Sequence, residues 1–239
     1  MRKDKLELLR EWINLSDNIV FFGGAGVSTE SGIPDFRSTD GLYHIKYVYP
    51  PEEILSHSFF MTRTKEFFEF YMDKMINQEA EPNETHRKLK LLEEAGKLSG
   101  IVTQNIDGLH QRAGSKKVLE LHGSVHRNFC LSCKAFYDLD YVKEREGVPH
   151  CSCGGIIKPD VVLYEEPLNT AIIEEAIRLI QSAEVLIVGG TSLSVYPAAG
   201  LVDYYKGDRL ILINKTSTSY DSRADLLINA PLGEIFSQI

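Results

Sequence analysis

Short apolar runs recur along the chain, each bounded by glycine or polar residues. The first, Ile19 to Phe22, leads into the glycine-rich segment 23–26, which predicts a buried strand that turns tightly into a helix. Runs of this length and composition are typical of strands buried on both faces. Comparable runs, rich in β-branched residues or leucine, are Gly100 to Thr103, Val118 to Leu121, Val185 to Val188 and Leu210 to Ile213.

Three of the runs follow segments with apolar residues at helical spacing. Leu6 to Leu15 precedes the first run, Thr85 to Ala95 the second and Thr170 to Ser182 the fourth. Buried strands that alternate with helices predict an α/β fold on a parallel, doubly wound sheet.

Two stretches do not follow this alternation. Residues from about Ser38 to Ala80 are rich in aromatic side chains at helical spacing, and Val125 to Pro159 contains all four cysteines. Each predicts an insertion that forms part of a smaller second module. We expect the aromatic stripe to be helix core rather than a ligand pocket.

The composition limits the classes of function. A chain of 239 residues can form one sizeable core with a smaller insert, hence one catalytic unit. The charged segment Met1 to Arg10 predicts an amphipathic helix and lacks the apolar centre of a signal peptide. No run approaches the roughly 18 apolar residues of a membrane span, so we expect a cytoplasmic protein with no membrane partner. A net charge of −8 argues against a nucleic-acid partner and favours basic partners such as lysine-rich peptides.

The four cysteines have the spacing of a metal site. Cys130 and Cys133 are separated by two residues, and Cys151 and Cys153 by one, so the second pair is one residue shorter than in a zinc ribbon. Disulfides are rare in the cytosol, which favours thiolate ligation of a structural Zn²⁺.

A candidate phosphate loop follows the first run. Gly24, Ala25 and Gly26 allow the backbone to approach a pyrophosphate, and the N-terminus of the following helix would offer free amides. Thr29 stands where a third glycine is usual, and no acidic residue ends a second strand about twenty residues on. Taken alone, the segment fits a purely structural glycine turn equally well.

The residues that follow the loop carry a stronger pattern. Gly24 to Arg37 (GAGVSTESGIPDFR) resembles the signature of the sirtuin family. Further segments occur in the order of that family, and together they cover nearly the whole chain. They are Thr103 to Asp107 (TQNID), Leu121-His122-Gly123, the four cysteines, Gly190-Thr191-Ser192 and Ile213-Asn214.

The resemblance implies a Rossmann-like NAD domain, a small domain made of a zinc ribbon and a helical insert, and an acyl-lysine peptide bound in the cleft between them. The expected boundaries are residues 1–37, 81–124 and 160–239 for the NAD domain. The helical insert would be residues 38–80 and the zinc module residues 125–159.

His122 is the candidate base. It follows a predicted strand, and open α/β sheets carry their sites at the carboxyl ends of the strands. In the implied reaction, a ribose hydroxyl must be deprotonated by a group with a pKa near the working pH. By resemblance His122 is the catalytic histidine, although a lone histidine after a strand is more often structural.

Asn105 and Asp107 alternate with Ile106 after another strand, so the polar side chains can point one way and the apolar one the other. By resemblance, Gln104 and Asn105 meet the ribose and a structural water network, and Ile106, Asp107 and Phe36 line the nicotinamide pocket. Asn105 and Asp107 complete the catalytic set with His122. The alternative is that these polar residues cap the next helix.

The other candidates belong to the phosphates and the adenosine half. Arg37 offers planar donors to a phosphate, and Lys215 beside Asn214 keeps phosphorylated NAD open as an alternative. The cofactor-binding candidates are Gly24, Ala25, Gly26, Thr29, Phe36, Arg37, Gln104, Asn105, Ile106, Asp107, His122, Gly190, Thr191, Ser192, Asn214 and Leu232.

The peptide is expected to add a strand between Val161 to Tyr164 and Ser192 to Tyr196. Glu165 stands where glycine is common in the family, and we expect it to favour basic residues beside the acyl-lysine. Sirtuins that prefer acidic acyl groups look to carry a tyrosine and, three residues later, an arginine that pairs with the acyl carboxylate. Here Lys74 stands three residues after Tyr71 and the segment contains no arginine, which favours a neutral acyl group.

The expected activity is therefore NAD-dependent protein lysine deacetylation, with release of nicotinamide and transfer of the acyl group to ADP-ribose. A protein nucleophile is not required, and the nucleophile-elbow motif is absent. The alternatives are deacylation of other acyl groups, mono-ADP-ribosyl transfer to protein, and a binding module without catalysis.

Overall fold

The computed structural model describes residues 4–36, 41 and 47–239. The larger part is a six-stranded sheet in the order β3-β2-β1-β7-β8-β9, in which every neighbouring pair is parallel. The predicted α/β fold with a parallel sheet is confirmed. The strands are β1 (Ile19–Gly23), β2 (Leu98–Thr103), β3 (Val118–Glu120), β7 (Val185–Gly189), β8 (Leu210–Ile213) and β9 (Leu226–Ile228).

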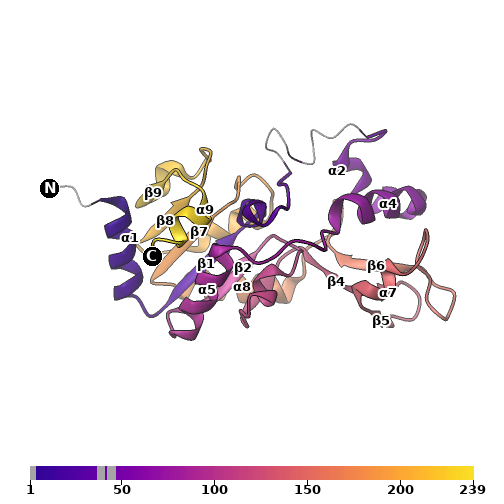
Figure 1. Ribbon diagram of the computed structural model, residues 1–239, viewed down its shortest axis with the longest axis horizontal. Helices are drawn as coiled ribbons and strands as arrows, with labels where there is room; N and C mark the ends of the chain where they lie inside the picture. Colours follow the sequence, from indigo (N-terminus) through magenta and orange to yellow (C-terminus); the bar gives the residue numbers. More distant parts are fainter. Residues whose placement is uncertain (1–3, 37–40, 42–46) are drawn as a thin grey trace.

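Helices cover both faces of this sheet (Figure 1). On one face α1 (Lys5–Leu15), α5 (Glu84–Glu94) and α9 (Leu232–Phe236) bury apolar residues against the strands. On the other face lie α8 (Thr170–Ser182) and a 3-10 helix, Ala198–Tyr204. The sheet is therefore doubly wound, as predicted from the helical segments that precede three of its strands.

The strand order reverses at β1, which lies between β2 and β7. The chain continues from β1 to β2 on one side and later returns to β7 on the other. Open α/β sheets bind ligands at such a switch point, outside the carboxyl ends of the strands. The fold therefore places a binding site after Gly23, Thr103 and Gly189, where these three strands end.

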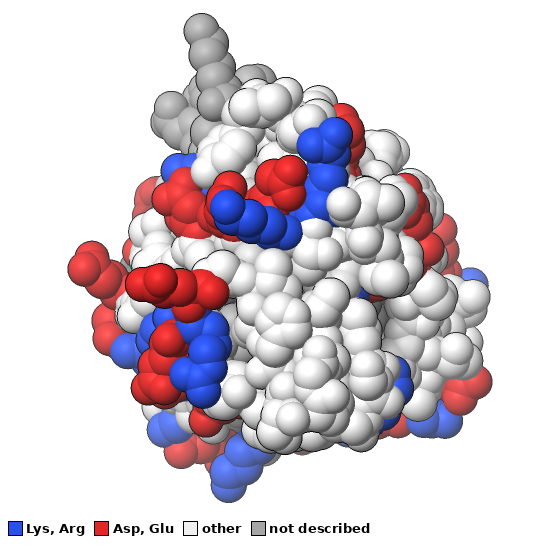
Figure 2. Space-filling model, turned by 90° about the vertical axis from the view of Figure 1, so that its right-hand side faces the viewer, with Lys and Arg blue, Asp and Glu red and all other residues white. Residues whose placement is uncertain are grey.

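A smaller module lies at the other end of the molecule (Figure 1). Its sheet has the antiparallel order β5-β4-β6, formed by β4 (Gly123–Cys130), β5 (Phe136–Tyr137) and β6 (Ile157–Val161). The helices of the module are α2 (Pro51–Ile54), α3 (His57–Thr62), α4 (Thr64–Phe70) with a π-helical turn (Tyr71–Met75), and α7 (Leu139–Lys143). On the outer face of this end, basic side chains lie beside acidic ones rather than forming a continuous basic surface (Figure 2).

The aromatic stripe forms the core of this module. Its rings are buried and pack edge to face or stacked, with centroid distances such as 4.9 Å between Phe60 and Phe67. The expectation that the stripe is helix core is confirmed for these side chains: Phe59, Phe60, Phe67, Phe68, Phe70 and Tyr71.

The segment after β1 differs from the prediction. Instead of an α-helix, two 3-10 turns follow, Ala25–Val27 and Thr29–Ser31. Gly32 ends the second turn with a φ of +84°, and Pro34 cannot continue a helix because it lacks the amide hydrogen. The helix predicted at the phosphate loop is therefore a short 3-10 helix with Gly24 at its N-cap, and it does not continue as an α-helix.

In the described ranges, no helix combines the length and the apolar composition needed to cross a membrane.

Two buried histidines lie where α5 meets α6 (Leu109–Arg112). The rings of His86 and His110 are 4.7 Å apart, and His86 Nδ1 accepts a hydrogen bond from the Asn83 amide at the start of α5. His86 Nε2 and both ring nitrogens of His110 are buried without a hydrogen-bond partner. Burial lowers the pKa of His86 to about 4 and that of His110 to about 3. The folded protein therefore keeps both imidazoles neutral.

We expect this pair to make the protein less stable in acid. Below a pH of about 6.5, the unfolded chain protonates each histidine while the folded chain does not, so the free energy of unfolding falls as the pH falls. The loss is about 1.4 kcal/mol per pH unit for each histidine until the folded pKa is reached. Urea titrations at pH 7, 6 and 5 measure it, and His110→Phe should reduce the slope. An equal slope in wild type and variant would contradict the assignment.

Candidate functional site

A cavity of about 1410 Å³ opens at the carboxyl ends of β1, β2 and β7 and extends toward the small module. Arg37 lies outside the described residues, so its predicted phosphate contact stays a prediction. Gly24 is absent from the lining but adjoins it through Thr191. All the other cofactor-binding candidates line the cavity: Ala25, Gly26, Thr29, Phe36, Gln104, Asn105, Ile106, Asp107, His122, Gly190, Thr191, Ser192, Asn214 and Leu232.

The glycine loop lies directly against the end of β7. The Gly26 amide donates to the Gly190 carbonyl at 2.7 Å, and a Cβ on Gly26 would lie 2.8 Å from Gly190 Cα. Two backbones can approach this closely only where side chains are missing. The glycines are thus required by the contact between the two loops.

Asn105 and Asp107 meet at one hydroxyl group. Asn105 Nδ2 donates to Ser28 Oγ at 3.0 Å, and Ser28 Oγ donates to Asp107 Oδ2 at 2.6 Å. Burial raises the pKa of Asp107, while the hydrogen bonds from Ser28 and the Leu109 amide oppose this effect. The prediction that Asn105 and Asp107 point the same way is confirmed by these contacts. Asp107 Oδ1 also accepts from the amide of Leu109, the first residue of α6, but the N-cap of this helix is Gly108, so the alternative of a side-chain cap is not confirmed.

Ser28 was not among the site candidates. It is buried, it belongs to the stretch that resembles the sirtuin signature, and its hydroxyl joins the loop after β1 to the residues after β2. The sequence signal was only a small hydroxyl residue next to the glycine loop, which is typical of many turns.

His122 follows β3 and has a fixed tautomer. Its Nδ1 lies 2.9 Å from the Gln104 carbonyl oxygen, which can only accept a hydrogen bond. Nδ1 therefore carries the proton, and Nε2 has a lone pair that can accept one. Burial lowers the pKa of His122 and the hydrogen bond to Gln104 opposes the effect, so the free imidazole is neutral at pH 7.

Polar side chains connect the ends of three strands. Gln104 Nε2, after β2, donates to Thr191 Oγ1, after β7, at 3.1 Å. Asn214 Nδ2, after β8, donates to the Thr191 carbonyl at 2.6 Å. Leu232, at the start of α9, packs over Gly189 and Gly190, where added Cβ atoms would lie 2.6 and 2.9 Å from its methyl carbons.

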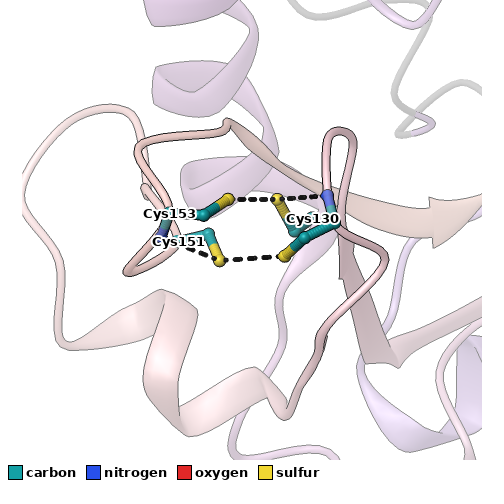
Figure 3. Close-up of side chains that lie close together, drawn as sticks. Cys130, Cys151 and Cys153 are labelled. Carbon is teal, nitrogen blue, oxygen red and sulfur yellow. Dashed lines mark hydrogen bonds between the residues drawn. The ribbon is translucent and has the colours of Figure 1, made fainter.

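The four cysteines converge at one point of the small module. Cys130 Sγ lies 3.5 Å from Cys153 Sγ, and Cys133 Sγ lies 3.4 Å from Cys151 Sγ. The sulfurs of the labelled cysteines point toward one another from the end of β4 and from the loop before β6 (Figure 3). All four lie within 4.8 Å of one another, close to the roughly 3.8 Å separation in a tetrahedral zinc thiolate site. The donor set fits Zn²⁺, and four protein ligands would make the site closed and structural.

The short second knuckle is accommodated by the glycines that follow it. Gly154 has a φ of +85°, and a Cβ on Gly155 would lie 2.7 Å from Cys130 Sγ. The turn therefore brings Cys151 and Cys153 to the same centre with one residue between them. Tyr137 Oη also donates to Cys151 Sγ at 3.0 Å, a contact that orients a metal ligand from outside.

Comparison with known proteins gives one consistent result. The sequence profile of the Sir2 family matches residues 24–197. The proteins named NAD-dependent protein deacetylase from Clostridium tetani and Clostridium acetobutylicum are 59% and 58% identical to this chain over 240 residues. These alignments cover 99% of this chain and 97% and 98% of the relatives.

Solved structures agree. A structure titled as Sir2 with p53 peptide and NAD+ matches with a TM-score of 0.88 at 37% identity, over 98% of this chain and 97% of that chain. A Sir2 variant with deacetylated p53 peptide and 3'-O-acetyl ADP ribose matches with a TM-score of 0.90 at 38% identity, with the same coverage. On sequence and fold together, this chain belongs to the Sir2 family.

Proposed function

We propose that the protein is an NAD-dependent protein lysine deacetylase that transfers the acyl group of Nε-acyl-lysine to ADP-ribose and releases nicotinamide. One observation carries this proposal. His122 lines the cavity as a neutral ring, and its Nδ1 donates a hydrogen bond to the Gln104 carbonyl, which leaves Nε2 free to accept a proton. Relatives that are more than half identical carry the name of this activity.

The proposed roles follow from the contacts at the site. His122 Nε2 accepts the proton of a ribose hydroxyl. Gln104 and Asn105 meet the ribose, and Asp107, connected to Asn105 through Ser28, holds the nicotinamide end. Phe36 and Ile106 give the nicotinamide apolar walls next to the aromatic core. NAD supplies the ADP-ribosyl group that receives the acyl chain.

The remaining candidates bind the other half of NAD. The backbone of segment 24–26 and the side chain of Thr29 take the phosphates, and Arg37 adds a guanidinium. The residues after β7 and β8, from Gly190 to Ser192 and at Asn214, hold the adenosine half, and Leu232 closes that end.

The four cysteines hold a structural Zn²⁺. The proposed domain division is residues 1–37, 81–124 and 160–239 for the NAD domain, with 38–80 and 125–159 as the small domain.

The proposed substrate is a peptide or protein with a neutral acyl-lysine, bound along segments 161–164 and 192–196, which both line the cavity. One neighbouring structure is titled as Sir2Tm bound to a propionylated peptide, which supports a neutral acyl chain. A cytoplasmic location and the lack of a nucleic-acid or membrane partner stay predictions.

The test is mass spectrometry of an acetyl-lysine peptide incubated with the protein, with and without NAD. Loss of one acetyl group only in the presence of NAD, with equimolar O-acetyl-ADP-ribose, is the expected result. Covalent ADP-ribose on protein would instead indicate mono-ADP-ribosyl transfer. NAD left intact would indicate a binding module.

The glycine loop yields a second test. Gly26→Ala is expected to raise the KM for NAD about tenfold or more, because the new Cβ meets the Gly190 backbone at 2.8 Å and overpacking costs about 1 to 3 kcal/mol. Gly200→Ala is the control, since its Cβ would contact only the Tyr196 ring at 3.6 Å. Equal KM values for NAD in both variants would contradict the proposed phosphate loop.

A further inference from the structure

Residues 162–166, which follow β6, form one edge of the cavity, and backbone hydrogen bonds attach this edge to His122 at one end and to the helical insert at the other. The Val162 amide donates to the carbonyl of His122 at 2.9 Å. Two residues later, the Tyr164 amide donates to the Leu55 carbonyl at 2.9 Å, and the Tyr164 carbonyl accepts from the His57 amide at 3.0 Å. This edge, residues 162–166, therefore extends from the backbone of the candidate base to the helical insert, and all of it lines the cavity.

Glu165 has an unfavourable backbone conformation at this edge. Its φ is +76°, in the left-handed region that glycine adopts without strain and other residues rarely adopt. Glycine is common here in the sirtuin pattern, so the side chain of Glu165 must contribute contacts that offset the strain. Those contacts are specific: Oε2 accepts from the Ser58 amide and Oε1 accepts from Ser58 Oγ, both at 2.9 Å.

The next residue attaches to the same helix. Glu166 Oε1 lies 2.8 Å from His57 Nδ1, and Glu166 Oε2 accepts from Lys158 Nζ at 3.0 Å and from the Leu163 amide at 2.9 Å. Burial opposes ionisation of Glu166, but these hydrogen bonds outweigh it and lower the pKa of the carboxyl. Two successive glutamates thus bind two successive residues, His57 and Ser58, at the start of α3.

We propose that the two hydrogen bonds between Ser58 and Glu165 act as a latch that fixes the cavity edge, residues 162–166, against α3. Glu165 is then a positioning residue for the acyl-lysine peptide. The inference rests on the proposed function and adds to it. It differs from the expectation that Glu165 selects basic residues in the substrate, because both of its carboxylate oxygens already accept hydrogen bonds within the protein. The latch acts on the peptide side of the cavity and leaves the NAD side alone.

The experiment compares Ser58→Ala, Glu165→Gly and Glu165→Gln with wild type on two acetyl-lysine peptides, one with neutral flanks and one with flanking lysines. Losing the latch should raise the KM of both peptides by about three- to tenfold, as expected for hydrogen bonds that are exposed to solvent. We expect kcat and the KM for NAD to change less than about twofold, since chemistry and NAD binding do not involve these atoms.

Two internal checks sharpen the result. Glu165→Gln should have an intermediate effect, because its amide oxygen can still accept one hydrogen bond from Ser58. The double variant Ser58→Ala with Glu165→Gly should be no worse than the more affected single variant, because the two residues share one interaction. Glu174→Gln, an exposed residue of α8, controls for the loss of a charge.

The outcomes separate the hypotheses. The latch is overturned if Glu165→Gly, which removes both hydrogen bonds to Ser58, leaves both KM values unchanged, or if both Glu165 variants lose affinity only for the lysine-flanked peptide. Absence of NAD-dependent turnover in wild type would overturn the proposed function instead. Fluorescence anisotropy of the labelled acetylated peptides then tests the latch by binding alone, with the same order of variants expected.

Discussion

His122→Ala is expected to lower kcat for NAD-dependent deacetylation by about a thousandfold, within the range assigned to general acid-base catalysis. The hydrogen bond from Nδ1 to the Gln104 carbonyl leaves Nε2 as the proton acceptor of a neutral ring, and alanine removes that acceptor. Single-turnover kinetics with an acetyl-lysine peptide measure the loss. Binding of NAD by calorimetry should persist, since the backbone of the phosphate loop is unchanged.

His126→Ala is the matched control for this variant. His126 is an exposed imidazole that lines the same cavity, with Nε2 3.1 Å from the Asp107 carbonyl. Because it is the fourth residue of β4 and does not follow the end of β3, we expect its variant to keep kcat within about tenfold of wild type. Equal losses in the two variants would show that the His122 result reflects damage to the cavity and not loss of a base.

Cys151→Ala is expected to remove bound zinc and unfold the small module. The four sulfurs lie at ligand distances from one centre, and a structural Zn²⁺ contributes about 10 to 16 kcal/mol of apparent binding free energy at pH 7, which is folding free energy. Zinc content by plasma mass spectrometry should fall from about one per chain to near zero. Near-ultraviolet circular dichroism should report disrupted packing of the aromatic core, which includes Cys151.

Ser152→Ala provides the control for the zinc prediction. Ser152 is exposed and lies between the two ligands of the short knuckle, so its variant alters the loop and leaves the sulfurs in place. We expect it to retain zinc and the wild-type unfolding temperature. A Cys151→Ala protein that keeps one zinc and its aromatic signal would contradict the four-cysteine site.

The parallel sheet could be predicted from the sequence because five of its strands contain short apolar runs, and four of these strands are buried along almost their whole length. The sixth, β9, has only three residues, Leu226–Ile228, and lies at the sheet edge beside β8. So short a segment carries no periodic signal, and its pairing depends on β8 being in place. The antiparallel sheet of the small module could not be predicted because β5 has only two residues, Phe136–Tyr137, and an irregularity between Ser124 and Asn128 breaks the alternation along β4.

The sequence also allowed the prediction that the candidate site residues lie close together, because most of them follow strands of the parallel sheet. The carboxyl ends of parallel strands share one edge of a sheet, so residues after β1, β2, β3, β7 and β8 had to approach one another. Contacts that depend on loop geometry could not be predicted: the Ser28 hydroxyl between Asn105 and Asp107, and the bond from Ser58 to Glu165. These pairs are far apart in the sequence and follow no periodicity.

The chain passes from β3 of the large sheet to β4 of the small one through two residues, Leu121 and His122, since β3 ends at Glu120 and β4 begins at Gly123. Gly123 has a φ of +78°, and a Cβ there would overlap the Asp160 carbonyl oxygen, so the crossing is tight and admits no side chain. A rotation of the small sheet relative to the large one therefore bends the chain beside the imidazole, as well as at the return connection from β6 to β7. A ligand that bridges the two sheets would therefore act on the orientation of the imidazole as well as on the position of the small sheet.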